Sequence, residues 1–454
     1  MKRTAIDTGL LEEVVGGLPR DAFTASREAA LARFRERGFP TTREEDWKYT
    51  NLAPVVEVSN RWLRQAAAGE LPPPALSPAG RERAEAVMRG IDAHWIVIGN
   101  GIVERDSLAP LAGLPGVAAA ASPAAPEPAL AGSALPAGDA LSLFNTALLR
   151  EALAIRLAPG TVLEKPLGLL VVDDAPHGQS LSLPRITVEA GANARASVVE
   201  VHVSAGAHEQ FANALVDVVV AAGGALRWLR LQQRALGHYQ VGRLRVRLAR
   251  DASFEHAGID LGGGLVRNDV AVEIGEPGAA VSLHGLYLAG GRQHVDNHTR
   301  VDHLVGPARS TEEYRGILTD RARGVFNGKA VVHPGADGTD ARQANHNLLL
   351  SAEAEVDTKP ELEIYADEVK CSHGATVGQL DENALFYLRT RGLSHHEAVQ
   401  ALTLAFARVV VSHCPVAEAC AHLERAVEAR LEELAVAVPA ERVPDGSATA
   451  GARP

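Results

Sequence analysis

The feature that most constrains the fold is a strand–turn–strand unit that recurs through the middle of the chain. Four segments carry it, and they begin at Ile186, Val216, Leu244 and Val270. In each segment, apolar side chains alternate as in a β-strand on both sides of a turn residue. The turns lie 32, 28 and 27 residues apart, at Gly191, Gly223, Asp251 and Gly278. A period of this kind without intervening helices is typical of strands stacked as the coils of a solenoid.

Two β architectures fit this spacing. Parallel strands normally need helical crossovers, but a β-helix makes its crossovers through the other faces of its own coil. An antiparallel sandwich is the alternative. The strand pattern runs from Ile155 to about Val377, which is long for one sandwich. We therefore expect a mainly β protein with a parallel β-helix core over residues 153–378.

Helical patterns precede this core, so residues 1–152 are predicted to form an N-terminal helical region. A helix is expected from about Leu10 to Gly38, where a glycine and a following proline end the pattern. His94–Asp106 predicts a hairpin that turns at Asn100-Gly101. The Ala/Pro-rich run from Leu114 to Gly138 favours a flexible connection.

A second helical region follows the core, over residues 379–438. Ser394 and Glu397 form a capping-box pattern at the start of one helix. A later helix carries an apolar stripe that comprises Val416, Cys420, Leu423, Val427 and Leu431. Such a stripe needs a neighbour to cover it, and the sequence does not identify one within the chain. Residues 439–454 contain too little apolar surface to fold and are expected to be disordered.

Charge and cysteine content limit the compartment and the partners. The formal net charge is −11, from 56 acidic and 45 basic residues, and no basic patch occurs, so neither nucleic acid nor an anionic membrane is expected as a partner. The N-terminus does not resemble a signal peptide, and no apolar run has spanning length. Three cysteines indicate a reducing compartment, so we expect a cytoplasmic protein.

The leading candidate for chemistry is the pair Cys371 and His373 in the sequence CSHGAT. Side chains at positions i and i+2 of an extended chain lie on the same face, so the thiol and the imidazole are expected to point the same way. A thiolate beside an imidazole is both a nucleophile and a soft metal ligand. The alternative is a packed cysteine beside a surface histidine, because a C-x-H pair alone is a weak signal.

A second group of candidate ligands lies in HVDNHTRVDH. His294 and His298 share a strand face, whereas His303 does not, so the first two form a weaker metal candidate and a polar face is the alternative. The chain contains no complete phosphate-binding loop, zinc-protease helix or G-x-S-x-G motif. We therefore expect no catalytic activity of its own.

Three stretches resemble the SufB/SufD family of iron–sulfur cluster assembly scaffolds. They are FPTTREEDWKYTNL, FNGKAVVHPGADGTDARQANHNLLLS and CSHGATVGQLDENALFYLRTRGLSHHEA. The pattern Cys371-Ser-His373-Gly374 is more similar to the SufD members, because SufB-like chains tend to carry a glutamate here. The absence of further cysteines in the core points the same way.

This resemblance implies a right-handed β-helix between two helical regions. It implies a heterodimer with SufB through the β-helix, and docking of the ATPase SufC through the C-terminal helices, for which the apolar stripe is the candidate. It also implies that a transient iron–sulfur cluster assembles at the SufB interface with His373, next to Cys371, as a ligand. No stably bound cofactor is expected. Whether a cluster, iron or flavin is retained, and whether the isolated chain forms a homodimer, stays open.

Two other functions remain alternatives. One is a β-helix enzyme that acts on polysaccharide, but only 4% of the residues are aromatic and no export signal is recognised. The other is a purely structural interaction module without a site.

Overall fold

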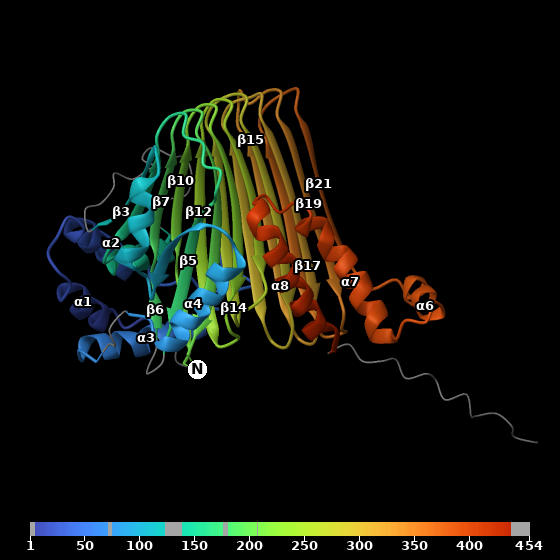
Figure 1. The fold of residues 1–454 in the computed structure, drawn as a ribbon, viewed down its shortest axis with the longest axis horizontal. Coiled ribbons are helices and arrows are strands. Elements are labelled where there is room, and N and C mark those ends of the chain that lie inside the picture. The colour runs from blue at the N-terminus through green and yellow to red at the C-terminus, as the bar shows by residue number, and fades with distance from the viewer. Residues whose placement is uncertain (1–4, 71–74, 123–138, 176–179, 207, 437–454) are drawn as a thin grey trace, which may run out of the picture.

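The computed structural model describes residues 5–70, 75–122, 139–175, 180–206 and 208–436. Its core is a flattened solenoid of two sheets, and the chain adds one strand to each sheet in every coil (Figure 1). The strands pair in parallel and in register from coil to coil. The expected parallel β-helix is therefore confirmed, and the antiparallel sandwich is excluded.

One sheet, the first sheet below, consists of β1 His94–Gly99, β5 Leu167–Asp174, β8 Arg195–Ala205, β11 Ala225–Gln233, β13 Ser253–Asp260, β15 Ala280–Ala289, β17 Arg309–Leu318, β19 Asp340–Leu349 and β21 Lys370–Gly378, with β2 Ile102–Val103 at its start. The second sheet consists of β4 Ala152–Leu157, β7 Arg185–Ala190, β10 Leu215–Val220, β12 His238–Leu248, β14 Leu265–Ile274, β16 His294–His303, β18 Arg323–Val332 and β20 Glu355–Ile364, with β3 Val117–Ser122, β6 Ser180–Ser182 and β9 Gln210–Ala212 at its margin.

The predicted turns connect the two sheets within a coil. Asp251 and Gly278 occupy equivalent positions in successive coils, and both adopt positive φ, 55° and 79°. A Cβ at Gly278 would overlap the Asp251 carboxylate of the preceding coil. Asp251 shows that a non-glycine residue can adopt this conformation, so at Gly278 glycine is favoured by the positive φ and by the close approach of the Asp251 side chain.

The start of the β-helix is closed by two antiparallel strands. The predicted hairpin is confirmed as β1 and β2, which pair through Ile98 and Val103, and Asn100 and Gly101 adopt positive φ at its turn. β1 also pairs in parallel with β5, so the hairpin begins the first sheet. Part of the Ala/Pro-rich run, expected to be flexible, is strand β3, which pairs antiparallel with β4 and covers its edge. The rest of that run, residues 123–138, lies outside the described residues.

The N-terminal region consists of helices that pack at this end of the solenoid, and one of them, Pro78–Gly90, lies on the outer face of the first sheet against β5 and β8. Its helices are α1 Thr8–Gly16, α2 Thr24–Arg37, η1 Glu45–Trp47, α3 Ala53–Ala67, α4 Pro78–Gly90, η2 Arg105–Gly113 and α5 Ala140–Ala147. The single helix expected from Leu10 to Gly38 is wrong: α1 and α2 are separate. Gly17 caps α1 and Pro19 follows it, and this pair interrupts the helical pattern.

The C-terminal region comprises α6 Glu382–Thr390, α7 His395–Val411 and α8 Ala417–Val436. The capping box of Ser394 and Glu397 is confirmed at the start of α7. α7 and α8 lie on the outer face of the first sheet, over β15 and β17, whereas α6 extends beyond the last strand (Figure 1). The predicted tail, residues 439–454, lies outside the described residues.

The apolar stripe of α8 is covered by the chain itself. Val416, Leu423, Val427 and Leu431 are at most 1% exposed, and they pack with Leu286, Leu288 and Ile317 of the first sheet. The expectation that this stripe lacks a partner within the chain is therefore wrong. The stripe could not be assigned from sequence because the outer face of a parallel sheet offers an apolar surface that only the folded coils assemble. No helix in the described ranges has the length and apolar content needed to cross a bilayer.

Candidate functional site

Cys371 and His373 lie on β21, the last strand of the first sheet, near the C-terminal end of the solenoid. Their in-register neighbours on β19 are Ala341 and Gln343, which are buried and face the interior between the sheets. The prediction that the thiol and the imidazole share a face is thus confirmed. No further coil of the described residues covers β21, so His373 is exposed and Cys371 is half-buried at the mouth of the interior.

This end of the solenoid, formed by β20 and β21, is called the end face below. Within the described part of the chain, β20 pairs only with β18 and β21 only with β19, so each of these long strands has one edge that no described strand pairs with. Three large apolar side chains are exposed there: Ile364 (43%), Tyr365 (61%) and Val377 (48%). Long unpaired edges beside exposed apolar groups are typical of a surface that another chain covers.

The environment of Cys371 does not activate its thiol. Burial raises the pKa of the Cys371 thiol above its ordinary value, a hydrogen bond from the Ala341 backbone opposes this, and the Asp340 charge adds to the rise. The cysteine is therefore protonated at neutral pH, and it becomes a thiolate only if a metal displaces the proton. The exposed imidazole of His373 is the more accessible ligand of the pair.

Beneath His373, one polar side chain from each of the next two coils points into the interior. Gln343 of β19 is aligned with His373, and Glu312 of β17 is aligned with Gln343. Gln343 Nε2 donates to Glu312 Oε1 at 3.1 Å, and Thr299 Oγ1 donates to Glu312 Oε2 at 2.5 Å. All three side chains are at most 4% exposed. Burial raises the pKa of Glu312 to about 7, although both hydrogen bonds lower it.

Sequence reasoning did not find Gln343 and Glu312. The signal was present, since Glu312, Gln343 and His373 follow one another at intervals of 31 and 30 residues, close to the repeat of the coils. Recognising it required knowing which residues of consecutive coils are aligned.

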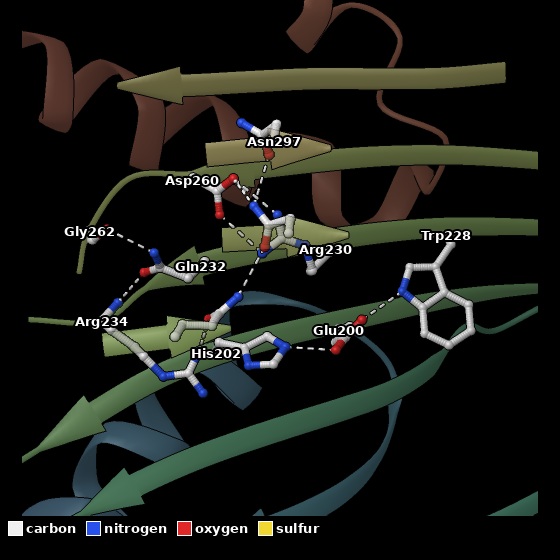
Figure 2. Close-up of polar contacts among 11 residues, drawn as sticks. Glu200, His202, Trp228, Arg230, Gln232, Arg234, Asp260, Gly262 and Asn297 are labelled. Atoms are coloured by element: carbon white, nitrogen blue, oxygen red, sulfur yellow. Dashed lines mark hydrogen bonds and ion pairs between the residues drawn. The ribbon is translucent and has the colours of Figure 1, made fainter. Parts of the chain in front are cut away.

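Deeper in the interior, charged groups are paired with one another rather than solvated (Figure 2). Arg230 donates to both oxygens of Asp260 at 3.0 Å, and Asn268 donates to the same carboxylate at 2.8 Å. Glu200 accepts a hydrogen bond from Trp228 Nε1 at 2.8 Å and lies 2.7 Å from His202 Nε2. Because a buried charge must be compensated, this network is explained by structural pairing alone.

The second candidate group is divided between two faces, as predicted. His294 and His298 lie on the outer face of β16, and His303 lies in the interior, 2.9 Å from Ser310 Oγ. His294 Nε2 is 2.7 Å from Thr50 Oγ1, and His298 Nε2 is 3.0 Å from Asp296 Oδ1. Among the described residues, no three His, Cys, Asp or Glu side chains are grouped as a metal site requires. His294 and Asp296 therefore hold the segment around Thr50 against the sheet, and His298 pairs with Asp296.

The stripe residues proposed as anchors for an ATPase lie inside the chain rather than on its surface. Val416, Leu423, Val427 and Leu431 face the first sheet, and the partly buried Cys420 Sγ lies 3.2 Å from Val416 O. We therefore correct their assignment to a partner interface. α6 instead has no buried residue, and its Phe386 and Tyr387 are 69% and 56% exposed.

Comparison with known proteins identifies the family. The model "SUF system FeS cluster assembly, SufBD core domain" matches residues 172–406, and the model "SufBD protein N-terminal region" matches residues 15–63. The chain is 30% identical to the iron–sulfur cluster assembly protein SufD of Escherichia coli (strain K12), over 83% of this chain and 86% of the relative. It is also 30% identical to a SufBD family iron–sulfur cluster assembly protein of Synechocystis sp. (64% and 66% covered) and to the chloroplastic protein ABCI7 of Arabidopsis thaliana (52% and 50%).

The first of these matched segments covers the β-helix from β5 to α7, including the end face and the Cys371–His373 pair. The second covers the N-terminal segment with Trp47 and Thr50, and Trp47 stacks on Arg267 of β14 at 3.8 Å. Neither match supports the alternative of a polysaccharide-active enzyme. The chain belongs to the SufBD family of iron–sulfur cluster assembly proteins and is similar to SufD.

Proposed function

We propose that this chain is a SufD-like scaffold subunit of a cytoplasmic assembly complex. SufB docks on the end face, and a nascent iron–sulfur cluster forms between the two subunits with His373 as a ligand. The ATPase SufC docks on the C-terminal helices and supplies the energy. In this proposal the cluster is cargo, no cofactor is stably bound, and the chain itself has no catalytic turnover.

One observation carries the proposal: the His373 imidazole is exposed on a strand whose outer edge is unpaired. A second chain that pairs with β20 or β21 would bring its own side chains directly over His373, because aligned residues of neighbouring strands lie about 4.8 Å apart. One buried polar atom near this mouth, Thr358 Oγ1, has no hydrogen-bond partner among the described residues. Both features suit an end that a partner completes.

The chemistry of the two candidate ligands differs. A neutral imidazole binds iron through the lone pair of one ring nitrogen and needs no deprotonation near neutral pH. Cys371 must lose its proton, which burial opposes. His373 is therefore the ligand in this proposal, and Cys371 is a packed thiol that adds stability to the last coil.

The candidate docking site for the ATPase is now the exposed aromatic pair on α6, because the stripe of α8 is buried. α6 extends beyond the last strand (Figure 1), and its Phe386 and Tyr387 side chains are exposed, so a partner can reach them. Aromatic anchors typically supply most of the energy of an interface. Phe386 also lines a hollow of mixed character, in which leucines such as Leu380 and Leu385 lie beside the charged Glu382 and Arg389.

Replacing exposed apolar side chains on the end face by lysine tests whether SufB docks there. The double variant Tyr365→Lys/Val377→Lys is co-expressed with SufB, and the captured SufB is measured after affinity purification of this chain. We expect SufB to be lost, because two ammonium groups would have to be desolvated in the interface. The matched control is Leu236→Lys, which changes an equally exposed apolar side chain (62%) away from the end face. SufB capture undiminished by the double variant would contradict the proposal.

A homodimer through the same face is the competing occupant in the absence of SufB. Light scattering measures the oligomeric state of the isolated chain. The same double variant shows whether a dimer forms through the end face. A dimer that becomes a monomer in Tyr365→Lys/Val377→Lys uses the end face, whereas a dimer that survives uses another surface.

A further inference from the structure

Gln343 has no role so far in the proposed cluster assembly. His373 of β21, Gln343 of β19 and Glu312 of β17 are aligned on neighbouring strands and face the interior, and Gln343 is the middle residue of the three. It is 4% exposed, and no solvent contact explains a polar side chain there.

Two hydrogen bonds determine how the Gln343 amide is oriented. Glu312 can only accept from it when ionised, so the NH2 group of Gln343 must face Glu312, as observed at 3.1 Å. Thr299 donates to the other Glu312 oxygen and keeps the carboxylate in place. An amide held by its NH2 group cannot flip, so the position of its carbonyl oxygen is defined as well.

That carbonyl oxygen, Gln343 Oε1, is buried and has no hydrogen-bond partner among the described residues. The nearby Asn345 amide is not free to supply one, because it donates to Tyr314 O and Tyr287 Oη. The aligned residue toward the end face is His373, about 4.8 Å away along the sheet, and its imidazole carries an N–H donor.

We infer that Gln343 is a positioning residue for His373: the structure shows no hydrogen bond between the two side chains, but a turn of the exposed imidazole would let a ring N–H donate to the unpartnered Gln343 Oε1. This hydrogen bond selects one tautomer of the neutral imidazole and turns the lone pair of the other ring nitrogen outward, toward the end face. Histidines that bind metals are commonly oriented in this way by an acceptor on their second nitrogen. The inference rests on the proposed function for its purpose, but the hydrogen bond itself can be tested without a cluster.

The direct test is the tautomer of His373 in the isolated full-length chain. ¹⁵N-histidine labelling and multiple-bond ¹H–¹⁵N correlation at pH 8.5 report which ring nitrogen carries the proton, and His373→Ala assigns the signals. In the natural sequence we expect one tautomer to predominate. In Gln343→Met, which keeps the length of the side chain and removes the acceptor, we expect the two ring-nitrogen shifts to move toward each other as the tautomers mix.

Two further variants separate positioning from packing. Gln343→Glu keeps an acceptor oxygen but would place a second buried carboxylate beside Glu312, so it is combined with Glu312→Gln; this exchange is expected to restore the single tautomer. Gln232→Met removes a buried glutamine from the same interior on β11, where its Nε2 donates to Gly262 O at 2.8 Å, and is expected to leave His373 unchanged. A melt of each variant reports its fold. Identical His373 shifts in the natural chain and in Gln343→Met would overturn the inference.

The iron–sulfur content of the complex co-expressed with SufB and SufC then tests whether this orientation of His373 serves cluster assembly. We expect about tenfold less cluster in Gln343→Met and near-normal content in Glu312→Gln/Gln343→Glu, since loss of such an orienting group typically lowers metal affinity or activity by 10- to 100-fold. A changed tautomer together with normal cluster content in both Gln343→Met and His373→Ala would support the hydrogen bond and reject the proposed function. The two ideas can thus fail separately.

Discussion

Replacing Glu312 by glutamine should make the protein more stable, and the gain should grow as the pH rises. Glu312 is 2% exposed and has hydrogen bonds from Thr299 and Gln343 but no positively charged partner among its described contacts. Burial raises its pKa from 4.5 to about 7. Glutamine has nearly the same shape and stays neutral, so the variant avoids burying a charge.

The magnitude follows from linkage. Between pH 4.5 and 7 the folded chain holds the Glu312 proton more tightly than the unfolded chain, so the free energy of unfolding falls as the pH rises through this window and levels off above it. A pKa shift of about 2.5 units corresponds to about 3 kcal/mol. For a chain of this length, that equals a change in Tm of about 3 °C.

The assay is the difference in Tm between Glu312→Gln and the natural sequence, measured at one scan rate from pH 4.5 to pH 8.5. Buried histidines such as His256 and His303, whose pKa values burial lowers to about 3 and about 4, oppose this dependence below pH 6.5. They are present in both proteins and cancel in the difference. Glu82→Gln on the exposed side of α4 is the control. A difference that is constant with pH, or that shrinks as the pH rises, would refute the reasoning.

The remaining predictions concern the site and its partners. His373→Ala should abolish cluster formation in the co-expressed complex without lowering its Tm, whereas Cys371→Ser should retain clusters; normal iron–sulfur content in a folded His373→Ala complex would reject the ligand. Phe386→Ala/Tyr387→Ala should reduce capture of the ATPase at unchanged Tm, and undiminished capture would exclude α6. Leu423→Ala should lower the free energy of unfolding by about 2–5 kcal/mol in denaturant titrations, because the Leu423 side chain is buried against the first sheet. A decrease below about 1 kcal/mol would show that the stripe is not part of the core. Purified alone, the chain should neither hydrolyse ATP nor release sulfide from cysteine, and either activity following the protein through two columns would contradict a scaffold.

The elements themselves were largely predictable from sequence. Period-two alternation around turns such as Asp251 and Gly278 predicted the coils, and the cap at Ser394 predicted the start of α7. The side of the strand on which Cys371 and His373 lie was predictable for the same reason, because it depends only on the local backbone. The break between α1 and α2 was missed, although Gly17 and Pro19 signal it.

What the sequence by itself determined was therefore local: the strands, their period, the helix caps and the common face of the two candidate ligands. Only the tertiary structure decided which surfaces remain free. The α8 stripe is buried because strands of the first sheet together present an apolar outer face, and the exposed pair on α6 remains uncovered. The alignment of His373, Gln343 and Glu312 likewise exists only once successive coils are stacked in register. Burial and alignment both depend on contacts between residues that are distant in the chain, and no pattern within a single segment encodes them.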